Sequence, residues 1–413
     1  MNKNKPAIRF KGFSDAWEQR QLGDIAVKVT EKNTQNTVSE TFTNSAEYGV
    51  ISQRDFFDHD VSNAEKIDGY YIIRNDDFVY NPRISTSAPC GPINRNKMGR
   101  NGVMSPLYTV FRTQNISHLF LEWYFKTSHW HPYMYFNGDS GARADRFSIK
   151  NDLFFQMPIP LPAEEEQCKI GAILERINNL ITLHQRKYEK LQNVKKSMLE
   201  KMFPKNGSKF PEIRFKGFTD AWEQRELSNI VDRLTRKNEN LESELPLTIS
   251  AQYGLIDQNE FFEKRIASKD VSGYYLLKKG EFAYNKSTSS DAPWGAVKRL
   301  DKYEMGVLST LYIVFALKMD GNIDSDFLVT YYDTDRWHKE VQAIAAEGAR
   351  NHGLLNISPN DYFKTNLTIS KSVAEQQQIG TFFRKLDHLI TLHQRESEKL
   401  QNIKKSMLEK MFV

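Results

Sequence analysis

The chain has few cysteines and no long apolar run, and both shortages narrow the kinds of protein it can be. Cys90 and Cys168 are the only cysteines among 413 residues, which argues against a disulfide framework and a zinc site with four cysteine ligands. No stretch approaches the roughly 18 consecutive apolar residues of a membrane helix, and residues 1–10 lack the apolar core of a secretory signal. We therefore expect a cytoplasmic protein without a membrane segment.

Short motifs of common catalytic sites are also missing. The sequence contains no glycine-rich dinucleotide fingerprint, no P-loop and no nucleophile elbow. His129 and His131 are spaced like a metal clip, but Arg336 and His338 stand at the matching positions later in the chain. We predict no catalytic residues, no metal and no cofactor on this chain.

Positive charge is concentrated in two segments. The chain carries +5 from 57 basic and 52 acidic residues. Residues 181–203 carry +4 from six basic and two acidic side chains, and residues 390–412 carry +2 from five and three, so the remainder sums to −1. This distribution suits a polyanionic partner without requiring one.

Two tracts of the sequence occur twice. Residues 8–22 read IRFKGFSDAWEQRQL and residues 213–227 read IRFKGFTDAWEQREL, while residues 181–203 and 390–412 share the frame ITLHQR–EKLQN–KKSMLEKMF. Between these tracts the halves align loosely, with framework positions kept and loops divergent. Internal repetition therefore predicts one folding unit used twice, with copy one over about 8–204, copy two over about 213–413, and a linker rich in Pro, Gly and Ser between them.

Each copy predicts a mixed α+β domain followed by a long helix. Strand-like runs rich in Tyr, Val, Ile and Phe alternate with turn residues, and one helical segment lies near 119–125. The extended segments 157–162 and 367–372 precede helices whose apolar residues recur in steps of three and four. A helix of roughly 40 residues is about 60 Å long, but a linker of about nine residues spans at most about 30 Å, so we expect the two helices to pack antiparallel.

At this point the sequence resembles the specificity subunit of a type I restriction-modification system. The resemblance rests on IRFKGFSDAWEQRQL at 8–22, IPLPAEEEQCKIGAIL at 159–174, the helix ending LEKMF, and their tandem repetition over nearly the whole chain. Copy two departs from the pattern at LTISKS, 367–372, where the prolines are missing.

The resemblance implies an α+β fold with two tandem target-recognition domains, separated by two long helices packed as an antiparallel coiled coil with pseudo-two-fold symmetry. We place the first domain at 1–162, the first helix at 163–204, the linker and second domain at 205–372 and the second helix at 373–413. The implied role is non-catalytic choice of a bipartite, asymmetric site on double-stranded DNA. Two modification subunits would methylate adenine and separate restriction subunits would translocate and cut, with S-adenosylmethionine, ATP and Mg²⁺ on those partners only.

Divergent polar residues in loops are the candidates for reading bases, because phosphate contacts carry no sequence information. The predicted DNA-binding residues of copy one are Arg83, Ser85, Thr86, Ser87, Arg95, Lys97, Arg100 and Asn101, and those of copy two are Lys286, Ser287, Thr288, Ser289, Lys298, Arg299 and Lys302. The alternative is that these are ordinary solvated loops.

A second candidate loop follows Gly-Ala in both copies. We assign Arg143 and Arg350 to contacts with the DNA backbone, with a buried structural salt bridge as the alternative. The residues after them differ between the copies, and we expect these to read bases: Asp145 and Arg146 in copy one, and Asn351 and His352 in copy two. Lysines near the helix ends, including Lys195, Lys196, Lys404 and Lys405, would approach phosphates, bind modification subunits or simply be solvated.

Two other function classes remain open from the sequence. A scaffold that binds two different proteins would show little salt-sensitive binding to DNA. A stand-alone methyltransferase would use Asn81-Pro82, which faintly resembles the Asn-Pro-Pro-aromatic motif of adenine methyltransferases, but the second proline and the aromatic residue are absent.

Overall fold

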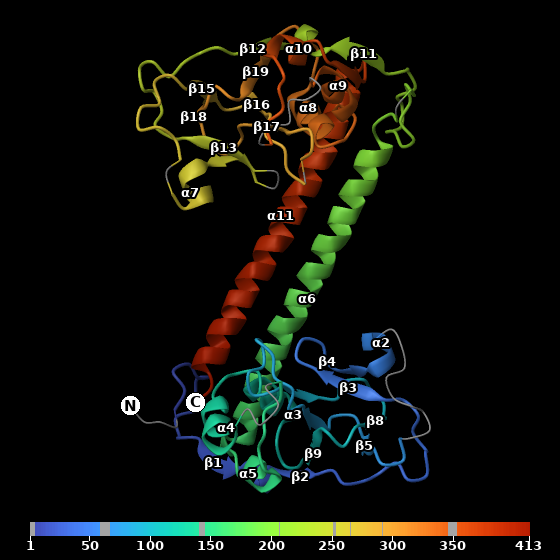
Figure 1. Cartoon of the computed structure of the whole chain (residues 1–413), viewed down its shortest axis with the longest axis vertical. Coiled ribbons are helices and arrows are strands. Elements are labelled where there is room, and N and C mark those ends of the chain that lie inside the picture. The colour runs from blue at the N-terminus through green and yellow to red at the C-terminus, as the bar shows by residue number, and fades with distance from the viewer. Residues whose placement is uncertain are drawn as a thin grey trace. The chain divides into compact units, whose positions relative to one another are not determined.

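The fold is described by a computed structural model covering residues 5–57, 67–139, 145–205, 207–250, 253–264, 266–290, 292–345 and 353–413 (Figure 1). The chain divides into two compact units, Met1–Gln185 with Arg395–Val413, called unit 1, and Arg186–Gln394, called unit 2. Each unit contains one α+β domain and a part of each of two 38-residue helices, α6 (Glu164–Lys201) and α11 (Val373–Lys410). These helices lie within the two ranges predicted for them.

The core of unit 1 is a four-stranded antiparallel sheet. Its strands, in the order β2-β9-β6-β7, are β2 (Ala26–Lys28), β9 (Thr109–Thr113), β6 (Phe78–Tyr80) and β7 (Ile93–Arg95). Phe78 pairs with Phe111 across β6 and β9, and their buried rings stack 5.5 Å apart. Aromatic residues on neighbouring strands thus hold the centre of this sheet together.

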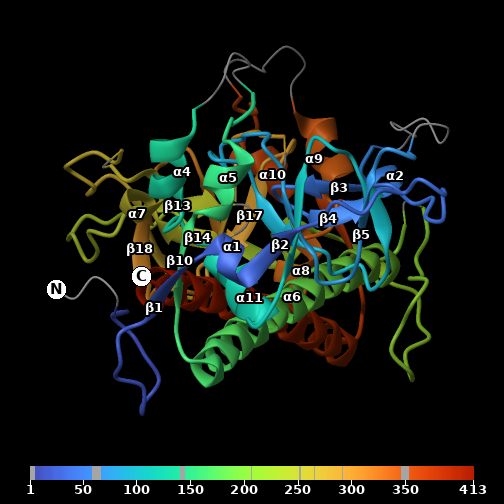
Figure 2. The same ribbon diagram turned by 90° about the horizontal axis from the view of Figure 1, so that it is seen from below.

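Three two-stranded sheets and five short helices complete the described part of the domain. They are β1 (Glu18–Gln21) with β10 (Pro158–Leu161), β3 (Phe42–Ser45) with β4 (Gly49–Ser52), β5 (Tyr71–Ile73) with β8 (Gly102–Met104), and helices α1 (Leu22–Ile25), α2 (Gln53–Phe57), α3 (His118–Tyr124), α4 (His131–Asn137) and α5 (Asn151–Phe155). In Figure 2, α1 lies beside α5 and β10, and the Leu22 amide donates to the carbonyl of Met157 at 2.8 Å. The repeated opening segment and the end of the domain therefore close on each other.

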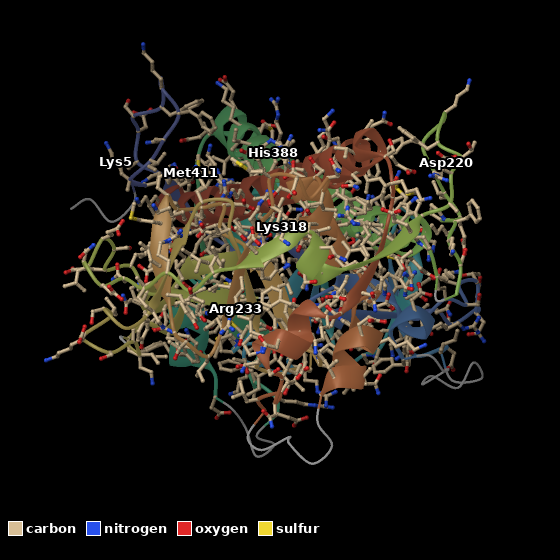
Figure 3. The ribbon with its side chains drawn as sticks, turned by 90° about the horizontal axis from the view of Figure 1, so that it is seen from above. Lys5, Asp220, Arg233, Lys318, His388 and Met411 are labelled. Carbon is tan, nitrogen blue, oxygen red and sulfur yellow. The ribbon has the colours of Figure 1, made fainter. Side chains whose placement is uncertain are left out.

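Unit 2 repeats this order of elements. Its main sheet has the strand order β12 (Val231–Arg233), β19 (Ile313–Leu317), β16 (Phe282–Asn285) and β17 (Ala296–Arg299). The paired strands are β11 (Glu223–Glu226) with β20 (Asn366–Ile369), β13 (Leu247–Ser250) with β14 (Gly254–Asp257), and β15 (Tyr275–Lys278) with β18 (Met305–Leu308). The helical elements are the 3₁₀ turn η2 (Leu227–Asn229) and the helices α7 (Gln258–Phe262), α8 (Ser325–Tyr332), α9 (His338–Ile344) and α10 (Pro359–Phe363). Lys318, labelled in Figure 3, donates to the carbonyl of Ser228 at 2.7 Å and ties η2 to the end of β19. The sheet at β20 forms without the prolines of β10.

Each long helix is attached to its own domain by a buried ion pair. Arg9 makes a two-pronged contact with Glu166 in the first turn of α6, with nitrogen–oxygen distances of 2.7 and 2.8 Å. Arg214 does the same with Glu375 in α11, at 2.6 and 2.9 Å. Both glutamates are fully buried, so these pairs explain why the IRFKG segment and the start of the helix recur together.

The far end of each helix enters the core of the unit built around the other copy's domain. The centre of the Phe203 ring, at the end of α6, lies 5.7 Å from the ring centres of both Trp222 and Phe327 in unit 2. The centre of the Phe412 ring, after α11, lies 5.5 Å from that of Phe120 in unit 1. Within each unit the start of one helix therefore meets the end of the other, which confirms the predicted antiparallel packing.

Polar contacts follow the same pairing of helix parts. In unit 1, Lys404 Nζ donates to Asn178 Oδ1 at 2.7 Å, and in unit 2, Lys195 Nζ lies 2.7 Å from Asp387 Oδ1. The predicted α+β fold with packed long helices is thus confirmed. Among the described residues, no helix is long and apolar enough to cross a membrane.

Candidate nucleic-acid interface

Two loops that are far apart in the sequence lie together in unit 1. The Phe147 amide donates to the carbonyl of Pro82 at 2.7 Å, and the Ile84 amide donates to the carbonyl of Asp145 at 3.0 Å. These bonds set Arg83 opposite Arg146 in an antiparallel bridge. The structure therefore brings together the two loops from which the sequence predicted base contacts.

An asparagine and a glycine give the first loop its shape. Asn81 Oδ1 accepts from the Arg83 amide at 3.0 Å, and its Nδ2 donates to the carbonyl of Asn44 at 2.8 Å. Gly91 closes the loop at φ +82°, where a Cβ would lie 2.1 Å from the carbonyl oxygen of Asn81. No other residue fits there, because both the backbone conformation and the space exclude a side chain. Cys90, beside it, is fully buried, as expected for a packing position.

Unit 2 builds the same pair of loops with different side chains. The Ser287 amide donates to Asn285 Oδ1 at 3.0 Å, and the Thr288 amide donates to the carbonyl of Gly353 at 2.7 Å. Gly295 has φ +82° and leaves only 2.2 Å between a Cβ and the carbonyl oxygen of Asn285. The backbone framework of the two loops is therefore shared by the copies.

The bridge in unit 2 corrects one alignment drawn from the sequence. Ser287 lies opposite Leu354, as Arg83 lies opposite Arg146. The counterpart of Arg146 is thus Leu354, and matching it to His352 was wrong, because the second loop of copy two is one residue longer after its Gly-Ala-Arg. The two copies consequently place an arginine pair and a serine–leucine pair at the same point of the fold.

The arginines of this bridge keep their charge available. Arg83 is exposed and Arg146 half-buried, and within the described part of the chain neither has an ion pair. Arg146 lines a pocket of about 440 Å³ together with Pro82, Leu107 and Ser148. Ser85, Thr86 and Ser87 are exposed on the same loop, with Ser85 Oγ 3.2 Å from Ser87 Oγ. A cation, hydroxyls and an apolar side chain are thus grouped at one surface.

The second group of predicted residues in copy one lies elsewhere and is held by carboxylates. Arg95 bonds Asp76 and lies 2.7 Å from Glu122, and only 12% of its side chain is exposed. Lys97 reaches Glu122 and Glu175, each at 3.2 Å. These pairs tie β7 to α3 and α6 and occupy both cations.

Two more members of that group lie just beyond β7. Arg100 makes two contacts of 2.7 Å with Glu40, and Asn101 is exposed beside it. The structure does not bring Arg95, Lys97, Arg100 and Asn101 to the paired loops.

The matching residues of copy two behave similarly. Lys298 lies 2.7 Å from Asp333, and Arg299 contacts Asp301 at 2.6 Å and Asp326 at 2.8 Å. Lys302 is exposed, with its ammonium 5.2 Å from the centre of the Tyr303 ring.

The loop residues of copy two are less charged than those of copy one. Lys286 is half-buried and burial lowers its pKa, whereas Ser287 and Ser289 are exposed and Thr288 donates its hydroxyl to the carbonyl of Gly353 at 3.1 Å. Arg143, Arg350, Asn351 and His352 lie outside the described residues.

The described residues offer no group of three or more His, Cys, Asp or Glu that could hold a metal ion. Burial lowers the pKa of both His129 and His131, which favours the neutral form of each imidazole.

Sequence reasoning missed an apolar contribution to this surface. Leu107 is 62% exposed in the turn before β9, and Leu311 is 57% exposed at the same place in copy two. In copy one, Tyr135 is also exposed, with its ring 6.1 Å from that of Phe147 in the second loop. The signal was present in the repeat, because both copies keep a leucine at this position of the turn.

Comparisons with known proteins agree with this architecture. A family model described as the type I restriction modification DNA specificity domain matches residues 14–193. The specificity subunit of the type I restriction enzyme MjaVIII from Methanocaldococcus jannaschii is 24% identical over 280 residues, which cover 63% of this chain and 62% of that protein's length. The crystal structure of the S subunit of a type I restriction-modification system from M. genitalium has a TM-score of 0.58 and 13% identity, covers 99% of each chain, and shows the likeness of fold. This chain is thus similar to type I restriction-modification specificity subunits, and its residues 14–193 match their DNA specificity domain.

Proposed function

We propose that this chain selects the DNA site of a type I restriction-modification complex, with each α+β domain reading one half of a bipartite, asymmetric sequence. The observation that supports this most is the divergence at the bridge between the paired loops. Both copies form the same backbone bridge, but Arg83 and Arg146 in one are replaced by Ser287 and Leu354 in the other. Equivalent frames with unlike side chains suit two different half-sites.

Chemistry assigns different bases to the two loop pairs. An arginine without an intrachain carboxylate can donate two hydrogen bonds to O6 and N7 of guanine. A serine hydroxyl can hydrogen-bond a base edge, and a leucine can contact the methyl group of thymine. We therefore propose that Arg83 and Arg146 favour a G·C pair in one half-site, and that Ser287 and Leu354 favour an A·T pair in the other.

The remaining predicted cations have a secondary role in this proposal. Arg95, Lys298 and Arg299 already satisfy buried or half-buried carboxylates, and moving them to DNA would leave those carboxylates unpaired. We propose that they hold the strand ends in place, and that exposed residues such as Lys302 contact phosphates. Specificity then lies mainly at the bridge.

The long helices would space the two domains and dock two modification subunits. Leu180 and Leu183 on α6 are 36% and 46% exposed, and their counterparts Leu389 and Leu392 on α11 are 39% and 42% exposed. Two equivalent apolar surfaces on a repeated helix suit two copies of one partner. In this proposal the modification subunits methylate the DNA, and the restriction subunits translocate and cut it. The complex would act in the cytoplasm.

Partner stoichiometry tests the docking proposal. In L183E, a charge replaces one exposed leucine of α6, so the complex should hold one modification subunit instead of two by native mass spectrometry. L392E is the matched variant on α11 and should give the same loss. Two subunits retained in both variants would contradict docking at these leucines.

Selection of bound sequences from a random duplex pool tests the proposed function. With the modification subunit present, the chain should enrich a two-part sequence, and its affinity should fall steeply with salt because DNA counterions are released. R146A should relax one base position of one half-site and weaken binding roughly tenfold, in line with about 1–3 kcal/mol for a bidentate contact. Equal affinity for all duplexes would refute site selection.

R100A provides the control for that experiment. Arg100 is paired with Glu40 away from the bridge, so its removal should leave the enriched sequence unchanged. If R100A relaxed a base position and R146A did not, the reading surface would lie at the strand ends and not at the paired loops.

A further inference from the structure

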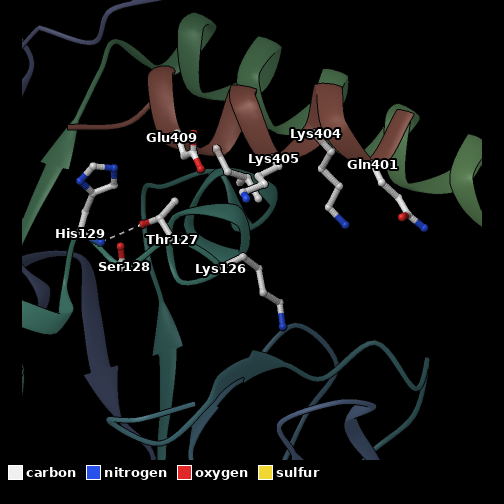
Figure 4. Close-up of a pocket in the computed structure, with 9 residues that line it drawn as sticks. Lys126, Thr127, Ser128, His129, Gln401, Lys404, Lys405 and Glu409 are labelled. Carbon is white, nitrogen blue, oxygen red and sulfur yellow. Dashed lines mark hydrogen bonds between the residues drawn. The ribbon is translucent and has the colours of Figure 1, made fainter. Parts of the chain in front are cut away.

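Unit 1 contains a basic pocket that shares no residue with the paired loops. It has a volume of about 520 Å³ and is lined by Lys126, Thr127, Ser128, His129, Gln401, Lys404, Lys405, Leu408 and Glu409. Figure 4 shows the turn after α3 on one side and the last turns of α11 on the other, with three lysines along the opening. Glu409 supplies the one carboxylate of this lining, so the three lysines and the glutamate give a net charge of +2.

Two of these lysines have only neutral partners within the described residues. Lys126 Nζ donates to Asn94 Oδ1. Lys404 Nζ donates to Asn178 Oδ1 at 2.7 Å and lies 4.9 Å from the centre of the Trp123 ring. An amide and a ring face orient an ammonium group, but they do not neutralise it.

The carboxylates whose charge acts on Lys126 and Lys404 are already engaged with other cations. Glu122 lies 2.7 Å from Arg95 and 3.2 Å from Lys97, and Glu175 lies 3.2 Å from Lys97. Burial lowers the pKa of both Lys126 and Lys404. For Lys126, the charge of Glu122 opposes this lowering and the charge of Lys404 increases it. The pocket therefore carries positive charge that its own carboxylates offset only in part.

In unit 2 a carboxylate neutralises the same position. The turn after α8 matches the turn after α3, because Thr127 and Thr334 each donate a hydroxyl to a carbonyl three residues earlier, at 2.7 and 2.6 Å. Asp333 consequently stands where unit 1 has Lys126. It lies 2.7 Å from Lys298 and 3.0 Å from Lys195, the counterpart of Lys404.

We propose that the unit 1 pocket binds a phosphate group, with Lys126, Lys404 and Lys405 as its cationic donors and Ser128 and Gln401 as neutral donors. A phosphate supplies the negative charge that Asp333 supplies in unit 2. Ammonium groups bind phosphate as point charges, and converging donors in a concave site strengthen each contact. The volume suits a nucleotide-sized molecule as well as a single phosphate of DNA.

Isothermal titration of the full chain at constant ionic strength tests the proposal. The probes are inorganic phosphate, ADP and a short random duplex, with chloride at matched ionic strength as the blank. K126D copies the arrangement of unit 2 and lets the new carboxylate pair with Lys404, so the variant should remain folded. We expect it to weaken binding of the effective probe at least tenfold.

Two further variants make the result specific to this pocket. K405A should weaken the same probe several-fold, whereas K196A, which removes the counterpart of Lys405 in unit 2, should leave its binding unchanged. Binding of phosphate or ADP that is lost in K126D supports the site and identifies a free phosphate compound as ligand. Loss confined to the duplex supports the site and identifies the DNA backbone.

Equal binding of every probe by the wild type and K126D would overturn the proposal. A K126D chain that unfolds would be replaced by K126Q, which removes the charge with little change of shape. K126Q should show the same loss of binding, and its failure to do so would likewise overturn the proposal.

Discussion

The turns after α3 and α8 occupy the same place in two copies of one fold, yet their electrostatics are opposite. In unit 2, Asp333 joins Lys298, Lys195 and Asp387 into one alternating chain of charges. In unit 1 the corresponding positions hold Lys126, Asn94, Lys404 and Asn178, and the chain of charges becomes lysines separated by amides. Lys195 and Lys404 lie in the repeated ends of the two helices, so the divergent turns after α3 and α8, together with Asn178 or Asp387 in the divergent first half of the facing helix, decide whether a helix lysine is neutralised.

This comparison separates what the repeat shares from what it varies. The buried Arg–Glu pairs and the phenylalanines after each helix are present in both units and define the common frame. The bridge between the loops and the turn after α3 or α8 differ, and both places are where we propose ligands. Shared elements should therefore matter equally in both units, and divergent elements should not.

Removing the terminal phenylalanines should produce the largest effects. F203A and F412A each leave a cavity among aromatic rings and should lower the free energy of unfolding of unit 2 and unit 1, respectively, by about 3–5 kcal/mol. Hydrogen exchange followed by mass spectrometry assigns each loss to its unit. A large loss in one variant and none in the other would show that the two cores are not equivalent.

The buried Arg–Glu pairs should come next. R9A leaves Glu166 buried without its partner, and R214A does the same to Glu375, so each should destabilise its own unit by about 3 kcal/mol. R20A removes an exposed pair with Glu18 and serves as control, since such pairs contribute well under about 1 kcal/mol. If R9A and R20A have equal effects on chemical denaturation, the pair does not anchor α6.

The network around Asp333 should add to the acid sensitivity of unit 2. Burial alone would raise the pKa of Asp333, but Lys298 and Lys195 together lower it below its ordinary value of 3.8. A lowered folded-state pKa contributes stability above that ordinary value, and this contribution is lost as the pH falls below it. D333N should therefore weaken unit 2 by about 1–2 kcal/mol at pH 7 and abolish part of its sensitivity below about pH 4.

Alkaline pH should affect the two helix lysines in opposite directions. In unit 1 the pKa of Lys404 is lowered by burial, so its contribution to stability rises as the pH rises from that lowered value toward 10.5. In unit 2, Asp333 and Asp387 overcome burial and raise the pKa of Lys195, so its contribution is kept up to 10.5 and lost above it. Hydrogen exchange of each unit between pH 8 and 11, corrected for intrinsic rates, should show this divergence.

The frame was predictable from the sequence because it depends on local patterns. The apolar spacing of α6 and α11 and the residues around β10 gave the helices and the extended segments before them. Antiparallel packing followed from the length of the linker. These features need no knowledge of which residues meet across the fold.

The site was only half predictable because it depends on contacts between distant residues. Arg83 and Arg146 were chosen as divergent cations, but their pairing across 63 positions is set by backbone bonds that no pattern reveals. Arg95 resembled them in sequence, and its carboxylate partners lie 19 and 27 residues away. The pairing of Lys195 with Asp333 spans 138 positions and was equally invisible.

Exchange of the reading surfaces tests the central claim most directly. Residues 23–155 would be replaced by their counterparts from copy two, which include Asp333, and this carboxylate can pair with Lys404 as it does with Lys195. In cells that supply the modification subunit, methylated adenines would be mapped across the genome. Two identical reading surfaces should move methylation from an asymmetric two-part sequence to a palindromic one, whereas methylation of the original sequence by the exchanged chain would contradict the account.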